Sequence, residues 1–210
     1  MPPVSINEKK LLIVEGQDEA KLCSKIIRER GIQGIQVIDV GGKDKFATLV
    51  PTICKTSGFA DVISIGFIRD ADNDSAAAFN SLRGIITKCA LTVPKELEAF
   101  HEKDGLRVGV FISPGGGRPG MLEDLFLETI SAHPLSQSVT DFVDKLAIIC
   151  PTNATGEIFR LAVNRQKAMV QSALCATPRP FNQLGIAAEA GYWDIDHPSL
   201  KRLVGFVCNI

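Results

Sequence analysis

The chain lacks an excess of charge of either sign. Its 23 lysine and arginine residues are nearly balanced by 24 aspartate and glutamate residues, so the formal net charge is −1 and the isoelectric point is about 6.3. Such a protein has no general positive field of the kind that attracts nucleic acids regardless of their sequence. A bound polyanion would have to be held locally, by a few lysines or arginines and by a metal ion.

Paired cysteines, long apolar runs and a nucleotide phosphate loop are also missing. The six cysteines lie far apart without a CxxC pair, so the sequence indicates neither a zinc cage nor a disulfide framework, and we expect a cytoplasmic protein in a reducing compartment. The apolar runs end well short of the roughly 18 residues that span a membrane, which predicts a soluble protein. Since no GxxxxGK[ST] motif occurs, we expect no intrinsic ATPase activity.

What is present is an alternation typical of an α/β protein. Hydrophobic residues make up 45% of the 210 residues, which is ample for a core. Short apolar runs alternate with amphipathic stretches, which predicts βαβ units and a mostly parallel sheet. The predicted strands are residues 10–15, 35–40, 62–69 and 106–113, and the predicted helices between and after them are 18–30, 43–57 with a kink or break at Pro51, 75–90 and 121–130.

The last third of the chain has a helical pattern throughout. We predict helices at residues 139–149, 156–175, 183–190 and 199–207. The expected fold is therefore a Rossmann-like, mostly parallel sheet of about four strands flanked by helices in residues 1–130. A helical C-terminal subdomain in residues 131–210 is expected to pack on it.

Acidic residues follow two of the predicted strands directly. Glu15 abuts the apolar run 11–14, and Asp70 and Asp72 follow the apolar run before them. In open parallel sheets, ligands bind beyond the carboxyl ends of the strands, where loops and helix N-termini converge. Glu19, one helical turn beyond Glu15, and Glu123, after the fourth strand, are expected to face the same crevice.

Five carboxylates in one crevice could not all remain ionised without cations, because like charges a few Å apart raise one another's pKa. Mg²⁺ or Mn²⁺ ions prefer such oxygen ligands and promote phosphoryl chemistry. Taken singly, each acid could also be a solvated turn residue or a helix cap. It is their joint placement that favours a metal site.

Two other motifs are weaker than they look. The segment 70–74 resembles the start of a calcium loop, but Ser75 replaces the required glycine and Ser81 stands where the bidentate glutamate belongs. The glycine-rich loop 114–120 formally contains GxGxxG, yet Pro119 removes an amide donor and no second strand with a terminal acid follows at the required distance. Neither an EF-hand nor a dinucleotide site is expected.

The strand-end motifs resemble a known family. Val14-Glu15-Gly16 and Asp70-Ala71-Asp72 are similar to the two signature motifs of the Toprim domain, which occurs in topoisomerases, bacterial primases, the ribonuclease that matures 5S ribosomal RNA and the OLD nucleases. The resemblance covers about residues 10–130. The glutamate spacing after the first strand, and the Leu-Glu pair after the glycine-rich loop, are most similar to OLD-type Toprim domains and to small stand-alone DUF3226 proteins of unassigned function.

The resemblance implies roles for the acids and for one lysine. Glu15, Asp70 and Asp72 would hold one Mg²⁺ or Mn²⁺ ion and contribute to catalysis, and Glu19 and Glu123 would help to hold a second ion. OLD-type nucleases also use a lysine beyond the Toprim core. The residue in this chain that we nominate for that role is Lys167, although a lysine on a polar helix face is more often simply solvated.

Three further basic residues are candidates for substrate binding. Lys43 and Lys45 follow the second strand, at the edge of the sheet where the acids are expected, and Arg118 lies in the glycine-rich loop. Each could contact phosphate.

Among the Toprim activities, hydrolysis is the one that the sequence favours. The single tyrosine, Tyr192, lacks the supporting domains of a topoisomerase, and the cysteine spacings exclude the zinc module of a primase. We predict a metal-dependent phosphodiester hydrolase, a nuclease, in which a metal-activated water attacks phosphorus. Nucleic acid, a separate ATPase and further copies of the chain are possible partners. A catalytically weak module that binds nucleic acids or nucleotides, and a hydrolase of a small phosphorylated molecule, stay open as alternatives.

Overall fold

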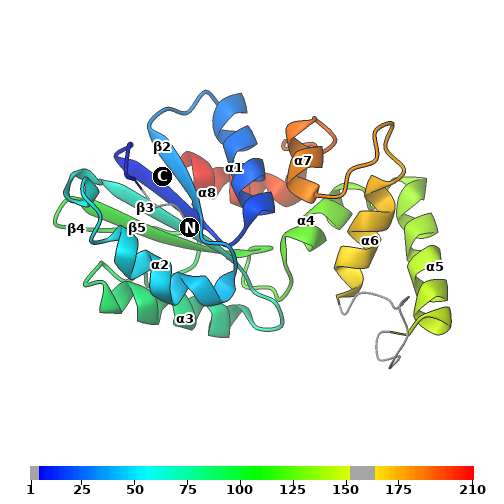
Figure 1. Ribbon diagram of the computed structural model, residues 1–210, viewed down its shortest axis with the longest axis horizontal. Coiled ribbons are helices and arrows are strands. Elements are labelled where there is room, and N and C mark those ends of the chain that lie inside the picture. The colour runs from blue at the N-terminus through cyan, green and yellow to red at the C-terminus, as the bar shows by residue number, and fades with distance from the viewer. Residues whose placement is uncertain (1–4, 152–163) are drawn as a thin grey trace.

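The protein is built around a five-stranded sheet with the strand order β2-β1-β3-β5-β4 (Figure 1). The computed structural model describes residues 5–151 and 164–210. The strands are β1 (Lys10–Val14), β2 (Ile35–Asp39), β3 (Ser64–Asp70), β4 (Phe100–Lys103) and β5 (Leu106–Ser113). All neighbouring pairs are parallel except β4 and β5, which are antiparallel.

Helices cover both faces of the sheet and extend beyond its carboxyl edge (Figure 1). The helices that pack on the faces are α2 (Phe46–Ile53) and α3 (Ser75–Lys88) on one side, and α1 (Gln17–Glu29), α4 (Leu122–Thr129) and α8 (Lys201–Cys208) on the other. Beyond the edge lie α5 (Pro134–Ile149), α6 (Arg165–Leu174) and α7 (Leu184–Glu189). Short 3₁₀ turns occur at Lys43–Lys45, Phe59–Asp61 and Pro198–Leu200.

The two-residue period of the strands sorts their apolar side chains between the two faces. In β1, Leu11 and Ile13 join the core beneath α2 and α3, whereas Leu12 and Val14 join the core beneath α1, α4 and α8. Because both faces are covered, the strand is apolar throughout, as expected for a buried parallel strand. The mixed α/β fold predicted from the sequence is confirmed.

The strand count differs from the predicted four, because the sequence pattern does not reveal β4. Its four residues, Phe100–Lys103, include only one large apolar side chain. That residue, Phe100, packs over Gly109 of β5 and stacks on Phe206 of α8, with ring centroids 4.9 Å apart. The strand therefore depends on tertiary pairing, which local periodicity does not encode.

The helical C-terminal third shares its core with the sheet. One hydrophobic cluster joins Val14 of β1 and Ile68 of β3 to Val143 of α5, Leu174 of α6 and Phe206 of α8. The predicted helix 156–175 is observed as α6 from residue 165, and residues 156–163 lie outside the described residues. In the part of the chain that the structure describes, no helix is long and apolar enough to cross a membrane.

Candidate functional site

The carboxyl ends of β1 and β3 bring two of the predicted acids together. These strands are neighbours in the sheet, and Val14 pairs with Ile68 in the register. Glu15 therefore follows β1 beside the last residues of β3, and its Oε2 accepts a hydrogen bond of 3.3 Å from the backbone N–H of Asp70. Adjacent parallel strands thus place Glu15 and Asp70 at one rim.

Two helix N-termini face this rim and add two more acids. Glu19 lies in the first turn of α1, and Glu123 lies in the first turn of α4. The backbone N–H of Leu122, at the start of α4, donates a hydrogen bond of 3.1 Å to Oδ1 of Asp70. The partial positive charge at each helix N-terminus offsets part of the negative charge that gathers here.

These side chains line one cavity of about 370 Å³, which we call the acidic cavity. Six carboxylate residues and one lysine contribute to its wall, together with three glycines, two glutamines and a leucine. Its lining residues are Glu15, Gly16, Gln17, Asp18, Glu19, Asp39, Gly41, Gly42, Asp70, Leu122, Glu123, Lys167 and Gln183.

Burial and neighbouring charges raise the pKa values of three carboxyl groups in this cavity, those of Glu15, Glu19 and Asp70. Glu19, Asp70 and Glu123 are each at most 9% exposed. Burial, reinforced by the charges of Glu15 and Glu123, raises the pKa of Glu19 to about 7. Burial and the neighbouring glutamates also raise the pKa of Asp70 well above its ordinary value. The pKa of Glu15 is raised by burial, although the hydrogen bond from Asp70 and the charge of Arg69 act in the opposite direction.

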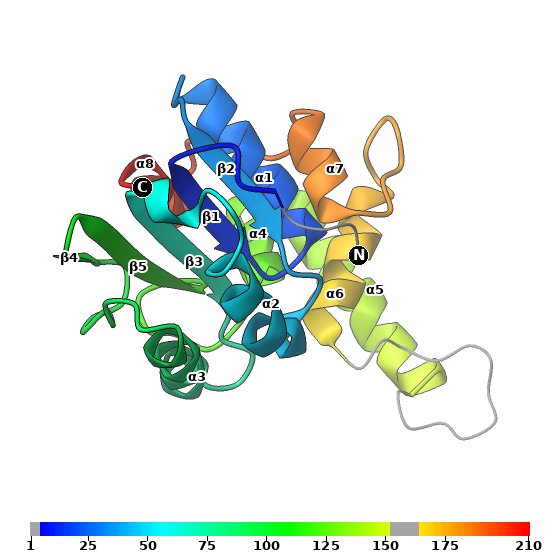
Figure 2. The ribbon, with the colours of Figure 1, turned by 60° about the vertical axis from the view of Figure 1, so that its left-hand side comes forward.

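Lys167 supplies the positive charge of the acidic cavity. Its Nζ lies 3.2 Å from Oε1 of Glu123, because α6 packs beside α4 at the carboxyl edge of the sheet (Figure 2). Burial alone would lower the pKa of Lys167, but the charge of Glu123 and its hydrogen bond to the ammonium raise it above the ordinary value. Lys167 is therefore a charged neighbour of the acids, although its side chain remains 58% exposed.

Asp72 takes a different position from the other predicted ligands. Its side chain lines a second pocket beside the acidic cavity, and its carboxylate Oδ2 lies 2.8 Å from Nζ of Lys43. The backbone of Asp72 is left-handed, with a φ of 51°, and its carbonyl accepts a hydrogen bond of 2.7 Å from Gly120. Within residues 5–151 and 164–210, no three histidine, cysteine or acidic side chains are placed so that one ion could contact all of them.

The predicted substrate-binding cations are distributed unevenly. Lys43 lies at the junction of the two pockets, but Lys45 and Arg118 line neither of them, and Arg118 instead forms an ion pair of 2.7 Å with Glu128. A cation that the sequence reasoning passed over, Arg69 of β3, lies beside Glu15. Its Nε is buried and lies 4.0 Å from Oε2 of Glu15.

Three other cavity residues were missed at the sequence level. Asp39 is the last residue of β2, so the strand-end rule that selected Glu15 and Asp70 could have found it. Asp18 accepts a hydrogen bond of 2.8 Å from the backbone N–H of Gly185, which ties α1 to α7. Gln183 reaches the cavity from the residue before α7, and no local signal marks it.

The chemistry of this donor set fits a hard divalent cation. The donors are carboxylate oxygens, which Mg²⁺ and Mn²⁺ prefer, and Glu15, Glu19, Asp70 and Glu123 all face the same small volume. Burial raises the pKa values of Glu15, Glu19 and Asp70, and neighbouring carboxylates raise those of Glu19 and Asp70 further, so a divalent ion would relieve repulsion among these groups. Lys167 balances only part of this negative charge.

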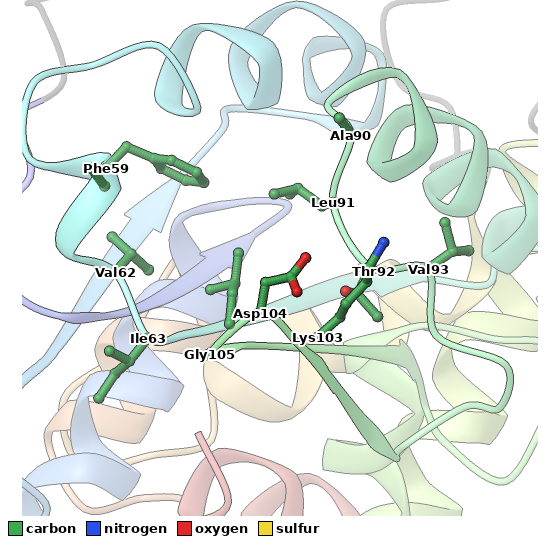
Figure 3. A pocket seen from close by; sticks show the side chains of 12 residues that line it. Phe59, Val62, Ile63, Ala90, Leu91, Thr92, Val93, Lys103, Asp104 and Gly105 are labelled. Carbon is green, nitrogen blue, oxygen red and sulfur yellow. The ribbon is translucent and has the colours of Figure 1, made fainter.

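A larger cavity than the acidic one lies at the opposite end of the strands. It measures about 580 Å³ and is formed by residues that precede β3, follow α3 and make the turn between β4 and β5. Figure 3 shows Phe59 and Leu91 directed into it, with Asp104 as its only acid. It lacks the clustered carboxylates, so the acidic cavity is the better candidate for chemistry.

Comparisons with known proteins identify the family. One similar solved structure is the C-terminal region of the OLD protein of Burkholderia pseudomallei, with a TM-score of 0.47 and 13% identity, covering 97% of this chain and 98% of that chain. Another is the C-terminal region of the OLD protein of Xanthomonas campestris pv. campestris, with a TM-score of 0.39 and 12% identity, covering 97% of this chain and 86% of that chain. No curated protein matches. Residues 9–210 match the family described as Protein of unknown function (DUF3226), and the chain therefore belongs to the DUF3226 family.

Proposed function

We propose that this protein is a Toprim-type, Mg²⁺- or Mn²⁺-dependent phosphodiester hydrolase. The single observation that carries the proposal is the acidic cavity, in which four buried or half-buried carboxylates from two strand ends and two helix N-termini face one volume. A set of buried acids costs stability unless cations compensate it. A cation-binding role explains why the fold keeps these residues.

Each charged residue of the acidic cavity has its own role in this proposal. Glu15, Glu19, Asp70 and Glu123 would hold the cation after their side chains move closer together, since no three of the described acids can contact one ion as they stand. When bound, the cation would supply positive charge for the phosphate and polarise a water. Lys167 is placed to stabilise the negative charge of the phosphate while it orients Glu123. Asp72 can join the metal ligands only if its contact with Lys43 opens.

Hydrolysis of a small phosphorylated molecule is the second candidate. Its support is the size of the acidic cavity, about 370 Å³, which lies at the lower end of the range of small-molecule sites. The neutral overall charge of the chain also provides no long basic track for a polymer.

The decisive experiment is hydrolysis in Mn²⁺ of a panel that contains single-stranded DNA, single-stranded RNA, nicked duplex, nucleotides and sugar phosphates. Asp70→Asn keeps the shape of the side chain and an acceptor for the Leu122 N–H, so its effect reports on charge. We expect it to lower activity by about 100-fold or more, as for other residues that tune a metal site. Asp104→Asn, which changes an exposed acid at the far end of the sheet, is the matched control.

The outcome separates the candidates. Cleavage of polymers that Asp70→Asn abolishes and Asp104→Asn retains supports a nuclease, and activity on nucleotides or sugar phosphates alone supports the small-molecule enzyme. A wild-type protein that is as inert as Asp70→Asn on the whole panel would refute the hydrolase. In an active enzyme, Lys167→Met should lower kcat more than Lys167→Arg does, since the arginine keeps the charge.

A further inference from the structure

The pocket that contains Asp72 is a direct neighbour of the acidic cavity. Its volume is also about 370 Å³, and it is lined by Lys43, Asp72, Asn73, Gly120, Met121, Asp124, Asn164 and Gln166. Three segments contribute consecutive residues to the two spaces. In each of these segments, one residue lines the acidic cavity and its chain neighbour lines the second pocket; the pairs are residues 42 and 43, 122 and 121, and 167 and 166. A molecule larger than phosphate could therefore occupy both.

The second pocket is distinguished by side-chain amides, and we call it the amide-lined pocket. Asn73, Asn164 and Gln166 each bear an amide, which is both a donor and an acceptor. Asn164 has a structural role, because its Oδ1 caps α6 by accepting a hydrogen bond of 3.2 Å from the backbone N–H of Lys167. Its Nδ2 contacts Sδ of Met121. Among the described residues, neither Asn73 nor Gln166 has a side-chain hydrogen-bond partner, and both line the pocket with at least part of the residue accessible.

The charge of the amide-lined pocket is unsuited to a phosphate group. Lys43 contributes one positive charge, and Asp72 and Asp124 contribute two negative charges, which gives a formal charge of −1. The single lysine is already paired with Asp72 at 2.8 Å. A neutral ring with N–H donors and acceptors at its edge fits better. The buried thioether of Met121 offers such a ring a polarisable apolar surface.

We propose that the amide-lined pocket is a nucleobase subsite, which binds the base of the nucleotide whose phosphate enters the acidic cavity. Glutamine and asparagine amides form paired hydrogen bonds with base edges, most often with adenine, and Gln166 and Asn73 are the residues placed to do so. Since a base in a duplex has its edge partly occupied, the subsite selects unpaired bases in single-stranded nucleic acid or in free nucleotides. The part of this inference that places the phosphate in the acidic cavity rests on the proposed function.

The test measures binding, so that it does not depend on turnover. Isothermal titration with Mg²⁺ present compares AMP, GMP, CMP and UMP with ribose 5-phosphate, which has the same phosphate and sugar but no base. We expect at least one nucleotide to bind about 10-fold more tightly than ribose 5-phosphate, and Gln166→Ala to remove that advantage. Gln166→Glu, which can only accept hydrogen bonds, should shift the preference toward bases with amino groups. Gln137→Ala, on the exposed side of α5, is the matched control.

A hydrolysis arm separates this inference from the proposed function. The p-nitrophenyl ester of thymidine 5′-monophosphate is compared with bis(p-nitrophenyl) phosphate, which has no base. If neither ester is cleaved but a nucleotide still binds better than ribose 5-phosphate, the hydrolase proposal fails and the nucleobase subsite stands. Equal binding of all four nucleotides and ribose 5-phosphate, or an unchanged preference in Gln166→Ala and Gln166→Glu, overturns the subsite whatever the hydrolysis assay gives.

Discussion

Glu19 shows at the scale of a single residue how a binding site conflicts with stability. Its carboxyl group is 8% exposed and has Glu15, Glu123 and Asp70 as charged neighbours. In the unfolded chain the same group is solvated and has its ordinary pKa. Ionised Glu19 therefore destabilises the folded protein in the absence of a compensating cation.

This conflict predicts a dependence of stability on pH. The folded-state pKa of Glu19 is raised from 4.5 to about 7, so the folded protein binds the proton more tightly than the unfolded chain does. Stability is unaffected by this group below about pH 4.5 and is progressively lost as the pH rises to about 7. Above that pH the loss is on the order of 3 kcal/mol.

Glu19→Gln should remove this loss. In metal-free buffer, the free energy of unfolding of the variant relative to the wild type should increase between pH 4.5 and pH 7, the two pKa values of Glu19. Urea denaturation at several pH values measures the difference, and saturating Mg²⁺ should reduce it by stabilising the wild type. A difference that is constant over this pH range would contradict the raised pKa.

Ala90 offers a second residue-scale prediction, about the backbone. It follows α3 with a left-handed φ of 56°, and the next residue, Leu91, donates a hydrogen bond to the carbonyl of Ile86, which completes a helix-ending motif that normally contains glycine. Ala90→Gly should raise the free energy of unfolding by about 0.5–1 kcal/mol.

The opposite exchange in the exposed middle of the same helix, Gly84→Ala, should also raise the free energy of unfolding by about 0.5–1 kcal/mol. Thermal unfolding of both variants tests whether the sign follows the backbone conformation.

Residues that follow strands could be predicted from the sequence, and residues brought in by tertiary contacts could not. Glu15 and Asp70 are adjacent because their strands are adjacent. The βαβ pattern indicates that both strands end at the same edge of the sheet, but it does not say that they are neighbours. The pairing of Asp72 with Lys43 depends on a left-handed backbone and on the loop after β2, and neither has a local signature. Lys167 was nominated by resemblance alone, because 44 residues separate it from Glu123.

At the scale of elements, α7 holds one wall of the acidic cavity through its close approach to α1. Gly185 permits this approach, since a Cβ at this position would lie 2.9 Å from Cα of Asp18 and from Cβ of Lys21. Gly185→Ala must separate the helices and should cost about 1–3 kcal/mol, as other overpacked contacts do. It should also weaken cation binding, because Asp18 and Gln183 would shift with the helices.

Gly205→Ala is the control for this substitution. Gly205 lies inside α8, and a Cβ there has no atom within 4 Å, so alanine should be neutral or stabilise by up to about 1 kcal/mol. Urea denaturation and Mn²⁺ titration of both variants provide the measurements. Equal stability of Gly185→Ala and Gly205→Ala would show that the contact between α1 and α7 is not tight.

Elements with strong periodicity were predicted well, and those defined by pairing were not. The apolar runs of β1, β3 and β5 and the helical spacing in α1 and α3 mark these elements to within two residues of their observed bounds. Asp74 caps α3 by accepting a hydrogen bond of 2.9 Å from the backbone N–H of Ala77, and aspartate is a preferred residue at this position. The start of α5 at Pro134, five residues before the predicted one, follows from His133, whose ring accepts a hydrogen bond from Leu135.

At the scale of the whole molecule, the continuous core connects the helical C-terminal third to the sheet. Trp193, the only tryptophan, is 2% exposed and packs edge-on against Phe126 of α4, with ring centroids 5.5 Å apart. The chain then returns to the sheet, where Phe206 of α8 stacks on Phe100 of β4. The C-terminal third thus covers part of one face of the sheet with α8 and shares a hydrophobic cluster with it.

This continuity predicts that residues 1–130 and 131–210 unfold together. The apolar residues around Trp193 and those beneath α8 belong to one hydrophobic cluster. Unfolding of either group would therefore expose apolar surface of the other, which favours a single cooperative transition. Tryptophan fluorescence, which reports on the C-terminal third, should therefore give the same denaturation midpoint as hydrogen exchange of the central strand β3. Phe126→Leu, which weakens the contact with Trp193, should lower both midpoints equally. If fluorescence changes at a lower denaturant concentration than β3 exchange, the C-terminal third is a separate cooperative unit, and its wall of the acidic cavity could open without unfolding of the sheet.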